Sequence, residues 1–262
     1  MAGNAHHARK IENPSLVHPQ AGPGEVLLHI RTTGCGSDVH FWRRSCIGDL
    51  TVDGDCILGH EPAGEVIQLG PGVSGLAVGD RVAVEPGVPC GYKVHAARFV
   101  HKLPDSISYR TASLLEPLSV ALHALRITPI DVGTPVAIFG AGPIGLLVMA
   151  VARASGAHPV VITDVDETRL EFARTFEPHC LTHKVEVGAM VRESANAQRM
   201  PAVVLECTGI ESSIIAASYT VRRGGRIDVV GVSSKPYLNN IPFMHLSLAE
   251  VQLRFINRYH GT

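Results

Sequence analysis

Apolar runs in the first half of the chain are short and are interrupted often by glycine and proline. Three of them, EVLLHI at 25–30, AGEVIQLG at 63–70 and DRVAVEPG at 80–87, have the length and composition of β-strands. Short strands separated by such turn residues are typical of a loop-rich, mainly antiparallel domain. The pattern therefore predicts a mainly-β domain over residues 1–126.

From about residue 127 onward, apolar strands alternate with segments of helical period. The predicted strands are 135–140, 159–164, 202–209, 226–232 and 251–256, and the predicted helices are 143–154, 166–176 and 211–221. Such alternation indicates a parallel sheet covered on both faces by helices. We therefore predict an α/β, Rossmann-type domain over residues 127–262, with the junction between Leu125 and Asp131.

A glycine-rich turn directly follows the first strand of this second half. Gly140, Gly142 and Gly145 have the spacing G-x-G-x-x-G, with a strand before them and a helix after them. The three glycines permit a tight turn, the approach of a pyrophosphate and close packing of helix on strand. A glycine-rich turn of another βαβ unit is the alternative. Asp164 favours a dinucleotide, because a carboxylate at the end of the next strand can bind the adenosine ribose.

Asp164 also bears on the choice of cofactor. Its carboxylate would repel the 2′-phosphate of NADP, so the sequence predicts NAD. Arg169, five residues further on, could weaken that repulsion, or it could stack on the adenine edge or lie in solvent.

Glu206 and Cys207 end a later strand close to where a cofactor lies in such folds, and for them we favour a structural role.

The charge of the chain narrows the class of partner. It carries 23 Lys and Arg against 24 Asp and Glu, which argues against nucleic acid or an anionic membrane as the main partner. No apolar run reaches the roughly 18 residues that span a bilayer, and the N-terminus lacks the apolar core of a signal peptide. We therefore expect a cytoplasmic protein whose six cysteines are reduced thiols.

The first half also holds residue types that bind a catalytic zinc ion. They occur in Cys35-Gly36-Ser37-Asp38-Val39-His40, in Gly59-His60-Glu61 and in Leu115-Glu116-Pro117. Cysteine, histidine and carboxylate are the ligands that such a zinc takes. Taken alone, a cysteine and a histidine at this spacing are better explained by a buried thiol and a surface imidazole.

The segments that carry a family resemblance include TGCGSDVHFW (33–42), ILGHEPAGEVIQLGPGV (57–73), LLEPLSVALHAL (114–125) and VAIFGAGPIGL (136–146). Through them, the chain resembles the medium-chain zinc-dependent alcohol dehydrogenase family. Within it, the chain is most similar to the polyol dehydrogenases of the sorbitol, xylitol and L-arabinitol type. The EPLSV and IPFM stretches look most like fungal L-arabinitol 4-dehydrogenases. The resemblance implies an incomplete GroES-like catalytic domain at 1–126 and an NAD-binding Rossmann domain at 127–262.

The resemblance also implies roles for particular residues, and these all concern one zinc ion, NAD and a small polyol or alcohol. The zinc ligands would be Cys35, His60 and Glu61, with Glu116 as a fourth ligand or a partner of the zinc-bound water. Asp38 would orient a ligand, Ser37 and His40 would pass a proton outward, and Phe41 would line the pocket. Pro143, Ile144, Asp164 and Arg169 would hold NAD, and Arg258 would reach the cofactor or substrate. The implied reaction is oxidation of a secondary alcohol to a ketone.

The sequence departs from the family pattern in three places. Only Cys90 remains of the lobe that usually holds a structural zinc, so we expect one zinc ion and not two. TGCGSDVH is one residue shorter than usual, which could shift a strand register or could be absorbed at Gly34. The chain stops at Thr262, and from this we expect an open, mobile catalytic half with low turnover.

Two further functions stay open beside the dehydrogenase. The first is a catalytically weak or inactive NAD-binding relict of the family, and the second is a zinc-less oxidoreductase of the quinone-reductase kind. The set Cys35, His60, Glu61 and Glu116 argues against the second. A homo-oligomer also stays open.

Overall fold

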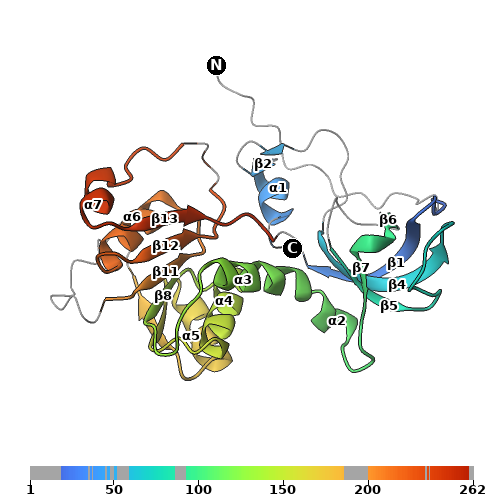
Figure 1. The fold of residues 1–262 in the computed structure, drawn as a ribbon, viewed down its shortest axis with the longest axis horizontal. Coiled ribbons are helices and arrows are strands. Elements are labelled where there is room, and N and C mark those ends of the chain that lie inside the picture. The colour runs from blue at the N-terminus through green and yellow to red at the C-terminus, as the bar shows by residue number, and fades with distance from the viewer. Residues whose placement is uncertain are drawn as a thin grey trace, which may run out of the picture. The chain divides into compact units, whose positions relative to one another are not determined.

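The computed structural model describes residues 19–34, 36, 38–44, 46–47, 50–51, 59–85, 93–185, 200–233, 235 and 237–259 (Figure 1). The chain divides into two compact units, Met1–Glu116 and Pro117–Thr262. Among the described helices, none is both long and apolar enough to cross a membrane.

The first unit is built on a five-stranded antiparallel sheet with the order β6-β1-β4-β5-β7. Its strands are β1 (Glu25–Gly34), β4 (Glu61–Leu69), β5 (Arg81–Val84), β6 (Lys93–Ala96) and β7 (Val100–Lys102). Smaller elements are α1 (Asp38–Arg44), the pair β2 (Cys46–Ile47) and β3 (Leu50–Thr51), a 3₁₀ helix at Ala97–Phe99, and α2 (Tyr109–Ala112). A buried cluster that includes Val26, Leu28, Val66 and Val82 forms one core of this sheet.

The pairing of β1 with β4 determines where the candidate metal site lies. Its register is irregular between Leu27 and Leu28 and again between Ile30 and Thr32. After the second irregularity, Gly34 pairs with Glu61 at the end of the ladder. The strand therefore delivers Gly34 opposite one of the predicted ligands.

The second unit is a six-stranded parallel sheet with the order β10-β9-β8-β11-β12-β13. Its strands are β8 (Val136–Phe139), β9 (Val160–Asp164), β10 (Leu181–Lys184), β11 (Val203–Glu206), β12 (Arg226–Val229) and β13 (Gln252–Phe255). Its helices are α3 (Leu115–Ile127), which begins in the first unit, α4 (Pro143–Ala154), α5 (Glu167–Phe176), α6 (Glu211–Thr220) and α7 (Phe243–Leu248). Counted along the chain, this is the Rossmann order 3-2-1-4-5-6.

Neighbouring residues of each central strand pack into two different cores, because side chains alternate across a sheet. Ile138 belongs to the core that includes residues of α3, α4 and α5. Phe139 belongs to the core that includes residues of α6 and α7 on the other face. Figure 1 shows these helices on the two sides of the sheet. The predicted fold class, a mainly-β domain followed by a Rossmann domain, is confirmed.

In the second unit, the structure adds three elements that the sequence pattern did not predict, β10, α3 and α7. The predicted junction between residues 126 and 127 falls inside the last turn of α3, whereas the two compact units divide after Glu116. The reason is that Ala121, Ala124 and Leu125 of this helix are buried in the core of the Rossmann sheet.

Candidate functional site

The candidate metal site begins at the turn before β4. Gly59 has a φ of 109°, a value that favours glycine, and a Cβ there would lie 2.6 Å from Cγ2 of Thr33. The turn brings His60 to Asp38, the first residue of α1, with Nδ1 2.5 Å from Oδ2 of the carboxylate. When Nδ1–H donates to Asp38, Nε2 is the ring nitrogen that can bind a metal.

Two carboxylates lie beside this imidazole. Glu61 opens β4, and its Oε2 occupies the space of a side chain at Gly34, where a Cβ would lie 1.6 Å from that oxygen. Glu116 lies in the first turn of α3 and is 9% exposed. One donor atom from each of His60, Glu61 and Glu116 lies within 4.8 Å of the other two. One imidazole and two carboxylates are a donor set that fits zinc, which takes nitrogen and oxygen ligands at about 2.0–2.2 Å.

The electrostatics of this cluster favour a cation. Burial raises the pKa of the Asp38 carboxyl. The hydrogen bond and the charge of His60 lower this pKa by more, so it lies below its usual value. Burial lowers the pKa of the His60 imidazole. Its hydrogen bond to Asp38 raises this pKa, as do the negative charges of Asp38, Glu116 and Glu61, so the pKa lies above its usual value. Burial is also the main cause that raises the pKa of Glu61. Three acidic groups around one imidazole therefore attract positive charge.

The structure tells less about the other predicted residues of the first unit. Cys35 and Ser37 lie outside the described residues. His40 is exposed on α1, two residues after Asp38, and Phe41 is partly buried on the same helix. Their predicted roles as ligand, proton relay and pocket wall stay predictions.

The three glycines of the G-x-G-x-x-G turn differ in their surroundings. Gly140 has a φ of 100°, and a Cβ there would lie 2.8 Å from Cγ2 of Thr208. A Cβ at Gly145 would lie 1.8 Å from the carbonyl oxygen of Gly140. Gly142 is the N-cap of α4, and a Cβ there would meet nothing within 4 Å. This open space before a helix N-terminus is where a pyrophosphate fits.

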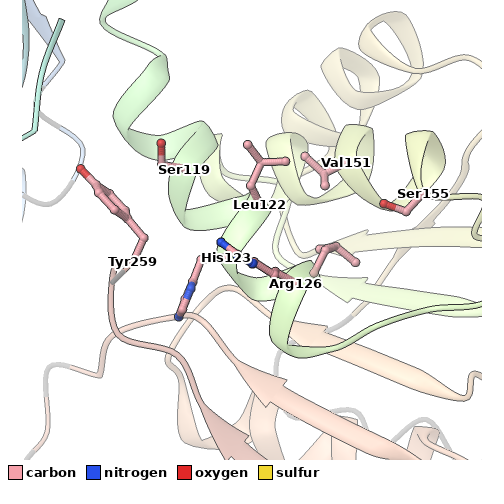
Figure 2. Close-up of a pocket in the computed structure, with 8 residues that line it drawn as sticks. Ser119, Leu122, His123, Arg126, Val151, Ser155 and Tyr259 are labelled. Carbon is pink, nitrogen blue, oxygen red and sulfur yellow. The ribbon is translucent and has the colours of Figure 1, made fainter. Parts of the chain in front are cut away.

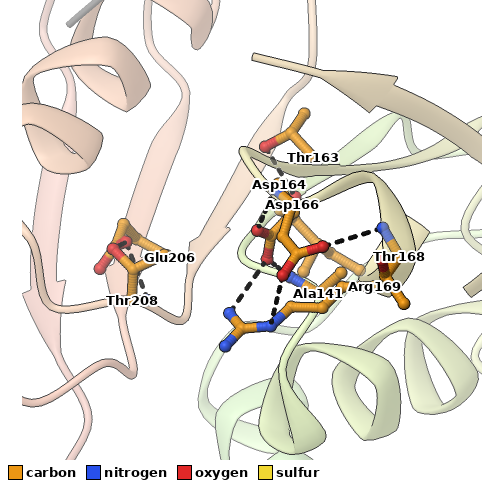
Figure 3. Close-up of polar contacts among 9 residues, drawn as sticks. Ala141, Thr163, Asp164, Asp166, Thr168, Arg169, Glu206 and Thr208 are labelled. Atoms are coloured by element: carbon orange, nitrogen blue, oxygen red, sulfur yellow. Dashed lines mark hydrogen bonds and ion pairs between the residues drawn. The ribbon is translucent and has the colours of Figure 1, made fainter. Parts of the chain in front are cut away.

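Asp164 lies at the same edge of the sheet and is 7% exposed. Its Oδ2 accepts a hydrogen bond from the N–H of Ala141 at 2.7 Å, and its Oδ1 accepts one from Asp166 at 2.9 Å (Figure 3). Nη1 of Arg169 lies 3.7 Å from Oδ2. The predicted ribose acceptor is therefore bonded directly to the glycine turn, and Arg169 lies beside the carboxylate.

The remaining predicted cofactor residues differ in their positions. Pro143 is exposed at the first position of α4, and Ile144 packs against the core of the sheet. Arg258 is exposed, has a φ of 53° and lies three residues after the end of β13. Its contact with a cofactor or substrate stays a prediction.

A cavity of about 500 Å³ opens between α3 and α4 (Figure 2). It is lined by Ser119, Leu122, His123, Leu125, Arg126, Val151, Ser155 and Tyr259. None of the predicted metal or cofactor residues lines this cavity, so we assign it no part in the chemistry.

The sequence pattern did not reveal the contact between Gly34 and Glu61. The two residues are far apart in the chain and meet only through the β1–β4 pairing. No spacing rule within one segment could have found this contact.

Comparisons with known proteins agree with this arrangement. The model of the alcohol dehydrogenase GroES-like domain matches residues 22–105, and that of the zinc-binding dehydrogenase matches residues 143–261. An L-arabinitol 4-dehydrogenase from Aureobasidium melanogenum is 43% identical, with 95% of this chain and 78% of that protein covered. A sorbitol dehydrogenase from Gallus gallus is 37% identical, with 97% and 80% covered.

Solved structures show the same architecture. The 2R,3R-butanediol dehydrogenase from Bacillus subtilis is 25% identical and has a TM-score of 0.79, with 95% of this chain and 81% of that chain covered. Galactitol-1-phosphate dehydrogenase from Escherichia coli, at 21% identity and a TM-score of 0.80, shows the fold alone, with 99% and 83% covered. The family resemblance seen in the sequence is confirmed. The chain belongs to the zinc-binding alcohol dehydrogenase family and is an oxidoreductase.

Proposed function

We propose that the protein oxidises a secondary hydroxyl group of an acyclic polyol to a ketone, with one zinc ion and with NAD as the hydride acceptor. The observation that carries the proposal is the cluster of His60, Glu61 and Glu116, with donor atoms within 4.8 Å of one another. The polyol class is supported by relatives named L-arabinitol 4-dehydrogenase, which are 40–43% identical to this chain. We take L-arabinitol as the first substrate to test.

The reaction converts a secondary alcohol and NAD⁺ into a ketone, NADH and a proton. When bound, the zinc ion supplies Lewis acidity toward the alcohol oxygen, and NAD supplies the hydride acceptor. Asp38 holds the imidazole of His60 in one orientation through the 2.5 Å contact. Glu61 and Glu116 add the negative charge that retains a divalent cation. Ser37 and His40 are our candidates for carrying the hydroxyl proton toward solvent.

The cofactor half of the proposal depends on Asp164 and the turn before α4. The carboxylate of Asp164 stays available to a ribose because each of its oxygens has two lone pairs, and each accepts one backbone N–H. The same negative charge disfavours a 2′-phosphate, so we expect NAD to be preferred over NADP.

The proposal is tested by measuring NADH formation from L-arabinitol, xylitol and sorbitol, together with the zinc content of the purified protein. We expect turnover with NAD, lower activity with NADP and about one zinc per chain. Asp38→Asn should lower the zinc affinity by about 10–100-fold, because the aspartate orients a ligand. His60→Ala should remove the metal and the activity.

His101→Ala is the matched control, because this histidine is 62% exposed in the same unit and lies 3.9 Å from Glu85. It should keep both zinc and activity. Zinc retained by His60→Ala would contradict the ligand assignment. NADH binding without turnover on any polyol would favour the alternative of an inactive NAD-binding member of the family.

We also propose that the protein forms a homo-oligomer through the β13 edge of its parallel sheet. In the described part of the chain, β13 is the outer strand on this side. Several large apolar side chains near it are exposed, namely Phe243 at 75%, Met244 at 63%, Leu248 at 65% and Phe255 at 70%. An open strand edge with apolar neighbours favours association with a second copy.

A further inference from the structure

Glu206, the last residue of β11, carries a fully buried carboxylate that neither the metal cluster nor the glycine turn uses. Its Oε1 accepts hydrogen bonds from the N–H of Thr208 at 2.9 Å, from the Thr208 hydroxyl and from the Ser213 hydroxyl at 2.7 Å. Its Oε2 accepts the N–H of Gly209 at 2.9 Å. All four donors follow within seven residues, so this one side chain organises the loop 207–210.

This loop packs closely against two glycines, neither of which leaves space for a side chain of its own. A Cβ at Gly140 would lie 2.8 Å from Cγ2 of Thr208, and a Cβ at Gly231 would lie 2.1 Å from the backbone nitrogen of Gly209. The loop therefore touches the first glycine of the dinucleotide turn on one side and the segment after β12 on the other. A displacement of the loop would disturb the turn itself.

The position of the loop in the sheet points to the cofactor. Strands β8 and β11 are neighbours, and the chain leaves β8 toward β9 but leaves β11 toward β12. Ligands of such sheets bind in the crevice outside the carboxyl ends of the strands where this reversal occurs. The turn 140–142 forms one side of the crevice, and the loop 207–210 forms the other. Figure 3 shows Glu206 and Thr208 together with Ala141 and Asp164 of this region.

We propose that Glu206 is a positioning residue for the dinucleotide, which fixes the loop 207–210 as the second side of the crevice without touching the cofactor. The role requires a carboxylate, because backbone N–H groups donate to both of its oxygens. A glutamine at this position has one NH₂ group, which would face one of these N–H donors in either orientation. The carboxylate is therefore not replaceable by its closest neutral analogue.

The test compares Glu206→Gln with Asp228→Asn. Asp228 is also fully buried, on the adjacent strand, but it bonds to Thr128 and Arg254 and to neither side of the crevice. Both changes remove a buried charge from the same sheet. An effect on stability alone should therefore appear in both variants, whereas an effect on positioning should appear only in Glu206→Gln. The readouts are the Kd for NADH by fluorescence titration, the zinc content, the melting temperature, and KM for NAD and for the alcohol.

We expect Glu206→Gln to weaken NADH binding by about tenfold or more, as loss of a hydrogen bond to a charged group implies. KM for NAD should rise while zinc content and KM for the alcohol stay unchanged. Asp228→Asn should lower the melting temperature and leave the Kd for NADH within about twofold, since its contacts are elsewhere. A Kd of Glu206→Gln within twofold of the original, or equal weakening in both variants, would overturn the proposal.

A milder variant tests the proposal without removing the charge. Ser213→Ala deletes one hydroxyl donor and keeps the carboxylate, with the other three hydrogen bonds in place. We expect NADH binding to weaken by about threefold, the size of one ordinary hydrogen bond, with no change in zinc content. An unchanged Kd in this variant would also count against the positioning role.

Discussion

At Gly142 no protein atom explains the glycine, and we attribute the requirement to the ligand. A Cβ there would meet no protein atom within 4 Å, and its φ of −77° suits any residue. At Gly145 the requirement comes from the fold, because a Cβ would lie 1.8 Å from the carbonyl oxygen of Gly140. The two glycines of one motif can therefore be distinguished by experiment.

We predict that Gly142→Val keeps the fold and the zinc ion but loses NADH binding, because the new side chain occupies the space of the pyrophosphate. Gly145→Ala should instead lower the melting temperature. Fluorescence titration with NADH and thermal unfolding of both variants check this. Retained NADH affinity in Gly142→Val would show that the turn has only a structural role.

Cys180 is a second residue whose environment predicts a measurable property. Burial raises the pKa of its thiol to about 11, with the charge of Glu177 adding to the effect and Arg153 opposing it. At pH 8 the reactive thiolate should then be about 100-fold rarer than for an ordinary cysteine. We predict that iodoacetamide labels Cys180 far more slowly in the native protein than in urea, as measured by peptide mass spectrometry. Equal rates in both states at pH 8 would contradict the burial.

Among the helices and strands, α4 is the element whose bounds the sequence predicted best. Helix α4 was predicted to the residue, Pro143–Ala154, because a glycine N-cap and a proline at the first position mark its start. Strand β10 was missed because it is an edge strand, mostly exposed, and gives no apolar run. Helix α7 has only six residues, too few for a helical period to show.

Helix α3 was missed although its sequence carries the signal. Ala121, Ala124 and Leu125 are all buried, and their spacing of three and four residues is that of a helix face.

The candidate metal residues, by contrast, could be predicted by type and resemblance but not by geometry. His60 and Asp38 are 22 residues apart, and only the fold brings them into contact.

A polar network around the buried Asp228 joins the end of α3 to strands β12 and β13. Asp228 of β12 accepts hydrogen bonds from the hydroxyl of Thr128, directly after α3, and from Nε of Arg254 in β13 at 2.9 Å. We predict that Arg254→Met destabilises the protein by about 1–3 kcal/mol, because it removes the cation that donates to a buried carboxylate. Urea unfolding measures this. The double variant with Asp228→Leu should recover much of the loss, and strictly additive losses would argue against the network.

For the molecule as a whole, each compact unit contains a separate part of the chemistry. The described candidate metal donors all belong to Met1–Glu116, and the glycine turn with Asp164 belongs to Pro117–Thr262. The change from short β runs to strand–helix alternation was enough to predict this order of domains. The junction was harder to predict because α3 contributes Glu116 to the metal cluster while its next turns are buried in the Rossmann core.

The exposed side chains at the β13 edge predict that the protein associates with itself. Phe255 on this strand and Met244 on α7 are 70% and 63% exposed, and apolar groups of this size beside a strand edge favour contact with another chain. We predict that the protein is oligomeric at micromolar concentration and that the double change Phe255→Lys with Met244→Glu yields monomers, as measured by light scattering after gel filtration. Phe172→Lys is the matched control, since this exposed phenylalanine lies on α5, which packs on the β9–β10 side of the sheet. The control should stay oligomeric, and the double variant should keep its NADH affinity because neither change reaches the glycine turn. A monomeric starting protein, or an unchanged mass in the double variant, would show that this edge does not hold two copies together.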